Sequence, residues 1–95
     1  MCTLIVARNV FAGFPIVVAA NRDELLDRPS EPPSVRDEGH HILAPKDLQR
    51  GGTWLGVNEF GVLAALTNRI EVISERGRES RGEIVSRALR ATSAR

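Results

Sequence analysis

The sequence predicts an α+β fold in which two antiparallel hairpins are followed by one helix. Three features of the 95-residue chain support this order. Two short runs rich in Val and Ile stand near the start, a second pair of apolar runs flanks a turn with glycine, and the last quarter has apolar residues at helical spacing. Short apolar runs bounded by turn residues are typical of strands, and apolar residues three and four positions apart are typical of a helix packed on a sheet.

The first hairpin is expected from the apolar runs at residues 3–7 and 16–20. The segment between them contains Asn9, Gly13 and Pro15, which favour a turn. Neither run alternates with polar residues. Both faces of this sheet are therefore expected to be covered, as in a layered α/β arrangement.

Residues 27–41 are polar and contain three prolines, so a loop is expected there. A brief strand is expected at residues 42–44. The pair Gly51-Gly52 predicts a tight bend before Trp54, because glycine adopts backbone angles that other residues avoid.

The second hairpin is expected from the apolar runs at residues 54–57 and 62–67, which flank a four-residue connection ending in Gly61. The two hairpins are expected to supply four central strands. Ser80 and Glu83 then have the spacing of a capping box, which predicts the start of a helix. Four apolar residues follow at helical spacing and predict a helix of about three turns on the sheet: Ile84, Val85, Ala88 and Leu89.

Composition excludes several classes of protein. The net charge of +1 argues against a nucleic-acid partner. No basic segment precedes the first apolar run, and Arg8 interrupts it too early for a spanning helix, so neither a signal peptide nor membrane insertion is expected. The single cysteine allows no intramolecular disulfide and fits a reducing compartment. We expect a cytoplasmic protein with no metal ion or cofactor.

The strongest chemical feature is Cys2. A side chain this small after Met1 normally permits removal of the initiator methionine, which would make Cys2 the first residue. A free α-amino group titrates near roughly 7.7–8.0 and could take the proton of the thiol, so that nucleophile and base belong to one residue. This arrangement suits attack on an amide or ester carbonyl. The alternative is that Cys2 only packs within a strand.

Polar residues end the second and fourth expected strands. Arg22 and Asp23 directly follow the second strand, whose end would approach Cys2 if the first two strands pair. A carboxylate there could hold the amine, and an arginine could favour the thiolate. Asn68 follows the fourth strand and could donate to an oxyanion. The alternative is that all of them are turn residues.

These features occur within five motifs that stand in a fixed order. The motifs are Met1-Cys2, Ala20-Asn21-Arg22-Asp23-Glu24 with Arg28-Pro29, Gly51-Gly52-Thr53-Trp54-Leu55-Gly56, Leu63-Ala64-Ala65-Leu66-Thr67-Asn68 and Arg81-Gly82-Glu83. In them the chain resembles the NRDE family, also called the Transport and Golgi organisation protein 2 family. The resemblance covers nearly the whole chain.

The resemblance implies an Ntn-hydrolase-like αββα sandwich, related to choloylglycine hydrolases and penicillin V acylases. It assigns the nucleophile to Cys2, the acidic partner of its amine to Asp23 and an oxyanion-hole donor to Asn68. Ala20 stands where those relatives have an arginine. Arg22, two positions later and so on the same face of a strand, is the candidate to replace it.

The family resemblance leaves two functions open. One is an amidohydrolase with an N-terminal cysteine that acts on a carbon-nitrogen bond of a small-molecule substrate. The other is a non-catalytic protein that binds or traffics haem, an acyl-lipid or acyl-coenzyme A. The adjacent His40 and His41 are interpreted as polar loop residues rather than haem ligands. A module for protein interaction, without a small-molecule site, is a third interpretation.

Family members are more than twice as long as this chain. We therefore interpret residues 1–95 as the N-terminal portion of a single NRDE-family domain, incomplete as an αββα sandwich. Such a portion is expected to need either the missing half-domain or a second copy in a homo-oligomer, because its apolar faces would otherwise stay uncovered.

Overall fold

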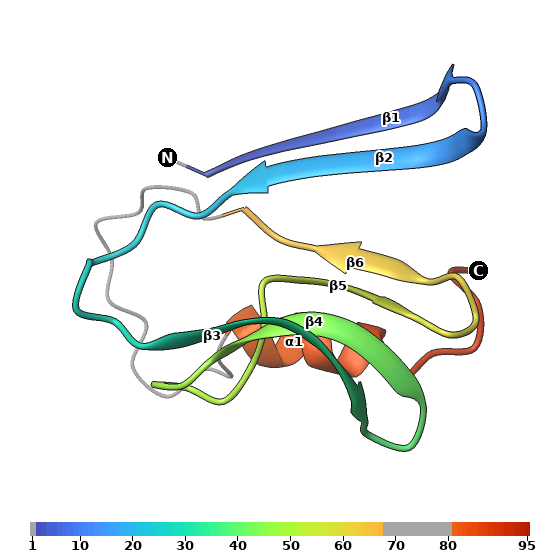
Figure 1. Ribbon diagram of the computed structural model, residues 1–95. Coiled ribbons are helices and arrows are strands. Elements are labelled where there is room, and N and C mark those ends of the chain that lie inside the picture. Colours follow the sequence, from blue (N-terminus) through green and yellow to red (C-terminus); the bar gives the residue numbers. More distant parts are fainter. Residues whose placement is uncertain (1, 68–80) are drawn as a thin grey trace. The chain divides into compact units, whose positions relative to one another are not determined.

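The computed structural model describes residues 2–67 and 81–95 and shows an α+β architecture, as expected (Figure 1). Its elements are β1 (Thr3–Phe11), β2 (Phe14–Asn21), β3 (Ser30–Asp37), β4 (His41–Asp47), β5 (Leu55–Asn58), β6 (Leu63–Ala65) and α1 (Arg81–Ala88). The strands form two antiparallel sheets, a pair β1-β2 and a four-stranded sheet of order β3-β4-β5-β6. The described residues fall into two compact units, residues 2–24 with Thr67 and residues 25–66 with 81–95.

The β1-β2 hairpin confirms the first predicted hairpin and is longer than expected. The strands pair from Thr3 opposite Asn21 to Phe11 opposite Phe14. The register shifts between Arg8 and Phe11, where Asn9 has a φ of 55°. Asparagine tolerates this left-handed conformation better than most residues, so the irregularity fits the sequence.

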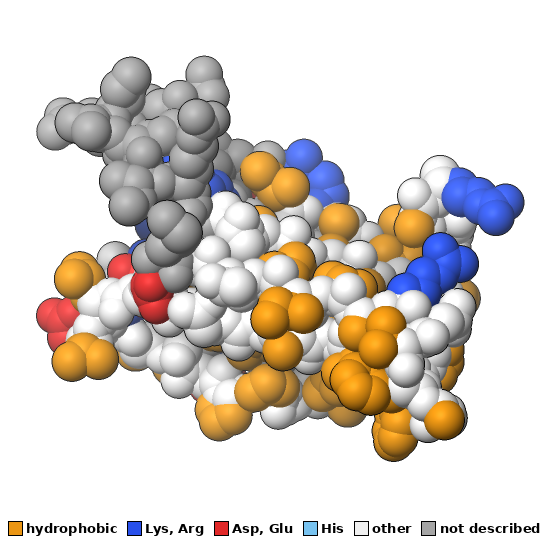
Figure 2. Space-filling model, turned by 90° about the horizontal axis from the view of Figure 1, so that it is seen from above, with side chains coloured by type: hydrophobic (Ala, Val, Ile, Leu, Met, Phe, Trp, Pro, Cys, Tyr) orange, Lys and Arg blue, Asp and Glu red, His pale blue; other side chains and the backbone are white. Residues whose placement is uncertain are grey.

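The hairpin does not have the two covered faces that its sequence predicts. Side chains alternate between faces, which puts Val6 and Ile16 on one face and Ile5 and Val17 on the other. All four are exposed, Ile5 at 59% and Ile16 at 54%. Figure 2 shows hydrophobic side chains, in orange, at several places on the surface in view. Within the described residues, nothing buries this apolar surface.

The expected loop at residues 27–41 is wrong over most of its length, since β3 lies there. β3 is an edge strand, and its register with β4 shifts between Glu31 and Ser34. The adjacent Pro32 and Pro33 occupy this shift, where missing backbone donors cost little. Proline therefore marks an irregular edge strand rather than a loop.

The second predicted hairpin is confirmed as β5-β6, with Gly61 at a φ of 79° in its turn. The brief strand expected at residues 42–44 is part of the longer β4. The expectation that the two hairpins share one set of central strands is not met: β5-β6 extends the β3-β4 pair, whereas β1-β2 forms its own sheet. The reason is that β4 is longer than the strand predicted at residues 42–44, and β5 pairs with it.

The core lies between one face of the four-stranded sheet and α1. It consists of Ile42 and Ala44 from β4 and Val85 and Leu89 from the helical segment. A methyl group added at Gly56 would come within 2.6 Å of the Leu89 side chain, so the helix lies almost directly on β5. Close packing of this kind fixes the helix on the sheet.

The helix itself is shorter than predicted and buries fewer of its apolar residues. Its eight residues make little more than two turns. Val85 and Leu89 are buried as expected, whereas Ile84 is 56% exposed and Ala88 is exposed. Ser80, the first residue of the expected capping box, lies outside the described residues.

An ion pair joins the segment before β3 to the end of β4. The guanidinium of Arg28 donates to both carboxylate oxygens of Asp47, with Nε 3.3 Å from Oδ1 and Nη2 2.5 Å from Oδ2. Asp47 Oδ1 also accepts the backbone N–H of Gln49. Because Asp47 is only 7% exposed, these bonds compensate the burial of its charge.

Candidate functional site

The structure brings the start of β1 and the end of β2 together. Thr3 pairs with Asn21 at the open end of the hairpin. Cys2 directly precedes β1, and Arg22 and Asp23 directly follow β2. The antiparallel register therefore brings the segments that precede β1 and follow β2 to the same end of the hairpin.

Asn21 links the two segments through its side-chain amide. Its Oδ1 accepts the backbone N–H of Thr3 at 2.6 Å, and its Nδ2 donates to Oδ1 of Asp23 at 3.1 Å. Sequence reasoning gave Asn21 no chemical role. The hairpin register could have identified it, because it places a polar side chain opposite the residue that follows Cys2.

The Asp23 carboxyl has a pKa below its usual value. The main cause is a hydrogen bond from the positively charged amino terminus of the chain, followed by the attraction between the two charges. Desolvation acts in the opposite direction and raises the pKa, and the amide of Asn21 makes the smallest contribution to lowering it. These effects favour the carboxylate form of Asp23.

Arg22 has an acidic neighbour, whereas Ala20 lies within the β1-β2 ladder. Nη2 of Arg22 lies 3.9 Å from Oε2 of Glu24, and both side chains are mostly buried, 16% and 21% exposed. Ala20 pairs with Leu4 within the β1-β2 ladder. The guanidinium of Arg22 therefore lies close to the carboxylate of Glu24.

Two further predicted features can be placed only in part. Cys2 is a free cysteine and is partly exposed. Asn68, the predicted oxyanion donor, lies outside the described residues.

The two histidines lie at the β3-β4 turn and have partners there. Nε2 of His40 lies 2.8 Å from the backbone oxygen of Arg90, and its ring meets that of Phe60 edge-on at 4.8 Å. Nδ1 of His41 lies 3.7 Å from Oε1 of Glu59. Among residues 2–67 and 81–95, no three His, Cys, Asp or Glu side chains are grouped so as to hold a metal ion. In the same residues, no helix has the length and hydropathy to cross a membrane.

Comparison with known proteins gives a consistent result. The chain is 39% identical to the mouse Transport and Golgi organization 2 homolog and 38% identical to the human homolog, in each case over 80 residues. It is 36% identical to the bovine homolog over the same length. These alignments cover 81% of the chain but only 29% of each relative, so the chain spans less than a third of their length.

No solved structure matches the chain. The sequence model of one family, described as Transport and Golgi organisation 2, matches residues 1–95, which is the whole chain. Together with the five ordered motifs and the three relatives, this match shows that the chain belongs to the Transport and Golgi organisation 2 family.

Proposed function

We propose that this chain carries the nucleophile end of an Ntn-type amidohydrolase, with Cys2 as the N-terminal nucleophile once Met1 is removed. The observation that carries the proposal is the Asn21-Asp23 pair. The charge partner of the Asp23 carboxylate is the amino terminus of the chain, which belongs to Met1, and the amide of Asn21 holds the first residue of β1. Removal of Met1 would make the next residue, Cys2, the carrier of that amino group. This is the arrangement that would position an α-amino group beside a thiol of the same residue.

In the proposed reaction the α-amino group takes the thiol proton, and the thiolate attacks the carbonyl carbon of an amide. The amide nitrogen takes a proton from the α-amino group and leaves. The acyl group then remains bound to Cys2 as a thioester. Water then hydrolyses the thioester and regenerates the thiol. Asp23 would orient the amine, Asn68 would donate to the oxyanion and Arg22 would favour the thiolate.

A second candidate is a non-catalytic carrier of haem, an acyl-lipid or acyl-coenzyme A on the same scaffold. The observation that favours it is the apolar surface of β1-β2, exposed on both faces. Such surfaces commonly mark the binding of apolar ligands or of other protein segments. In this case Cys2 would be structural or a soft ligand.

The same surface leads us to propose a covering partner, either the remaining length found in the relatives or a second copy of the chain. An isolated two-stranded hairpin is only marginally stable in water. The chain spans less than a third of its relatives, so additional polypeptide could cover the hairpin in a longer protein. We also propose a cytoplasmic location, where a reducing environment would keep Cys2 as a thiol.

The hydrolase proposal is tested by the mass and reactivity of the purified protein. The intact mass should lack Met1, and iodoacetamide should modify Cys2 faster than a simple thiol. Cys2→Ala should abolish turnover in a panel of linear and cyclic amides, and Cys2→Ser should keep the fold with reduced turnover. Retention of Met1 in active protein would exclude the proposal.

Asp23→Asn and Cys2→Ala together distinguish the hydrolase from the carrier, and Asp23→Asn tests the hydrolase first. For a hydrolase it should lower turnover while leaving the amide NMR spectrum of the chain largely unchanged. For a carrier, a spectral titration with haem should respond to Cys2→Ala, and no amide should be hydrolysed. Asp27→Asn, an exposed neighbour in sequence, serves as the matched control.

A further inference from the structure

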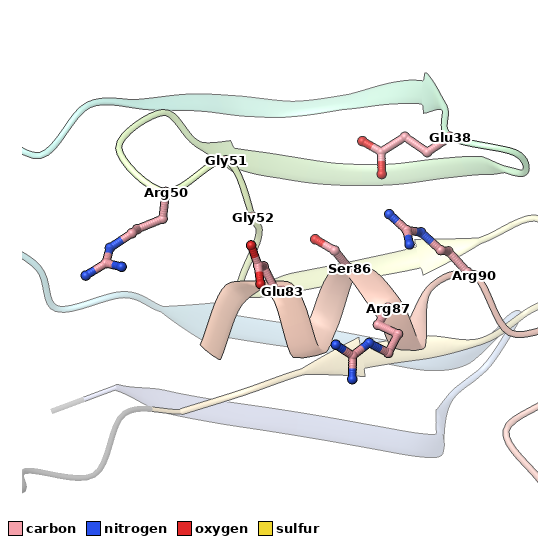
Figure 3. Close-up of a pocket in the computed structure, with 8 residues that line it drawn as sticks. All are labelled: Glu38, Arg50, Gly51, Gly52, Glu83, Ser86, Arg87 and Arg90. Atoms are coloured by element: carbon pink, nitrogen blue, oxygen red, sulfur yellow. The ribbon is translucent and has the colours of Figure 1, made fainter. Parts of the chain in front are cut away.

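The polar groove beside α1 and the open end of the β1-β2 hairpin differ in how their polar groups are arranged. In the groove, of about 410 Å³, Arg50 and Arg90 extend toward opposite ends of the helix, so their guanidinium groups do not converge on one point (Figure 3). At the open end of the hairpin, by contrast, the side chain of Asn21 makes hydrogen bonds to both of the chain segments that meet there.

Asn21 holds the backbone of Cys2 through the first peptide group of β1. Its Oδ1 accepts the N–H of Thr3 at 2.6 Å. This N–H belongs to the planar peptide group that joins Cys2 to Thr3, so the bond restrains the carbonyl end of Cys2 as well. Thr3 is also the residue that pairs with Asn21 in the antiparallel register. The bond therefore holds Cys2 at the place where β1 begins.

The same amide holds Asp23 through its nitrogen. Nδ2 of Asn21 donates to Oδ1 of Asp23 at 3.1 Å. A backbone N–H can only donate and a carboxylate can only accept, so these two partners fix the orientation of the amide. One planar group thus sets the place of the Asp23 carboxylate relative to the backbone of Cys2.

The effect of Asn21 on Asp23 is mainly one of geometry. Among the causes that lower the pKa of the Asp23 carboxyl, the amino terminus is the largest and the amide of Asn21 the smallest. Both side chains are exposed, and an exposed side chain without a partner changes rotamer readily. A hydrogen bond that contributes little to ionisation can still select one orientation, and reaction rates depend on displacements of about 1 Å.

We propose that Asn21 is a positioning residue of the N-terminal nucleophile. It holds the carboxylate of Asp23 beside the α-amino group that Cys2 carries once Met1 is removed, and it acts through Asp23 rather than on the substrate. The inference rests on the proposed function of Cys2, because it concerns the same amino group.

The test is a double-mutant cycle on the rate at which iodoacetamide modifies Cys2, the single cysteine, in the chain freed of Met1. A carboxylate beside the amine favours the ammonium that forms when the amine takes the thiol proton, so Asp23→Asn should slow the modification. Asn21→Ala should slow it by roughly tenfold, because a displaced group loses its effect. The double variant should be no slower than Asp23→Asn alone, because Asn21 acts through Asp23.

Two further variants control for shape and for local disturbance. Asn21→Leu restores the volume of the side chain without its hydrogen bonds, and it should be as slow as Asn21→Ala. Thr3→Ala changes the neighbouring side chain but keeps the backbone N–H, and it should leave the rate unchanged. With any amide that the protein hydrolyses, Asn21→Ala should lower kcat and leave KM nearly unchanged. A preserved amide NMR spectrum shows that each variant is folded.

The role of Asn21 and the proposed hydrolase fail in different ways. An unchanged rate in Asn21→Ala, a recovered rate in Asn21→Leu, or losses that multiply in the double variant would each overturn the role of Asn21, even if amides are hydrolysed. If no amide is hydrolysed but the cycle gives the expected rates, the hydrolase fails and the role of Asn21 in the reactivity of Cys2 stands. An unchanged rate in Asp23→Asn would overturn both, because Asn21 acts through Asp23.

Discussion

At the scale of single residues, Asn58 shows how one buried side chain organises the end of the four-stranded sheet. It is only 6% exposed. Its Oδ1 accepts the N–H groups of Phe60 and Val62 at 2.9 and 3.0 Å, which closes the β5-β6 turn. Its Nδ2 donates to the carbonyls of Leu89 and Ala91 at 3.0 and 2.6 Å, just beyond α1. One amide therefore satisfies groups from both the turn and the helix end.

Asn58→Ala should lower the free energy of unfolding by about 2–4 kcal/mol, because it leaves several buried donors and acceptors without partners. Thermal or urea unfolding measures the effect. Gln49→Ala, on an exposed turn residue, is the control and should stay within about 0.5 kcal/mol of the unmodified protein. A loss at Asn58 no larger than that of the control would show that water replaces its bonds.

The lowered pKa of Asp23 predicts a pH dependence for the end of the β1-β2 hairpin. Because the folded pKa lies below the unfolded one, the stabilisation is present above roughly pH 3.9 and is lost as the pH falls through the folded pKa. An NMR titration of the Asp23 side chain should give a value below roughly 3.9.

Acetylation of the amino terminus tests the cause of that shift. It removes the positive charge that is the main partner of Asp23, so the titration should move back toward the usual aspartate value. Asn21→Ala should produce a smaller upward change, because the amide contributes less. An unchanged titration after acetylation would contradict the assigned charge partner.

At the scale of elements, the sequence predicts strands well where apolar residues are contiguous and poorly where prolines interrupt them. The runs that became β1, β2, β5 and β6 were recognisable from their Val, Ile and Leu content. β3 was not, because its Pro32 and Pro33 resemble a loop until the edge position and register shift are known. Pairing between distant segments decides such cases, and it cannot be derived from local composition.

The candidate site shows the same limit. The pairing of β1 with β2, which sets Cys2 and Asp23 at one end of the hairpin, was predicted. The bridging role of Asn21 and the ion pair between Arg22 and Glu24 depend on side-chain conformations, which no sequence pattern specifies. The sequence predicted a tight bend at Gly51-Gly52 but not the contact between Gly52 and Gly82.

The contact of α1 with the loop before β5 explains two of those glycines. A Cβ at Gly52 would lie 2.6 Å from the backbone of Gly82, whereas a Cβ at Gly82 would meet its nearest atom at 3.3 Å. The backbone N–H of Thr53 also points to the oxygen of Gly82 at 3.4 Å. The two motifs that contain these glycines therefore pack main chain against main chain.

Gly52→Ala should destabilise the protein by about 1–3 kcal/mol, because the backbones must separate to admit the methyl group. Gly82→Ala should cost less, since alanine gains up to about 1 kcal/mol over glycine in a helix and its contacts are less severe. Unfolding in urea distinguishes the two variants. An equal or greater loss in Gly82→Ala would contradict the contact described for Gly52.

At the scale of the whole molecule, the two compact units differ in how they bury apolar residues. The unit of residues 25–66 and 81–95 has a core in which Leu89 is fully buried and Ala44 is 1% exposed. The unit that contains β1-β2 leaves large side chains such as Val10 and Phe14 exposed at 67% and 63%. Burial of apolar surface is the main source of stability, so the two units should open at different free energies.

Hydrogen exchange should reveal this difference residue by residue. In dilute solution the amides of β1 and β2 should exchange much faster than those of β4 and α1, because a two-stranded hairpin has too little buried surface to stay closed. If a second copy covers the hairpin, protection of β1 and β2 alone should increase with protein concentration. The double variant Val6→Thr with Ile16→Thr should remove that increase if the second copy binds the face that both side chains share. The double variant Ile5→Thr with Val17→Thr tests the opposite face in the same way. Hairpin amides as protected as β4 in dilute solution would show that the hairpin is stable without a partner.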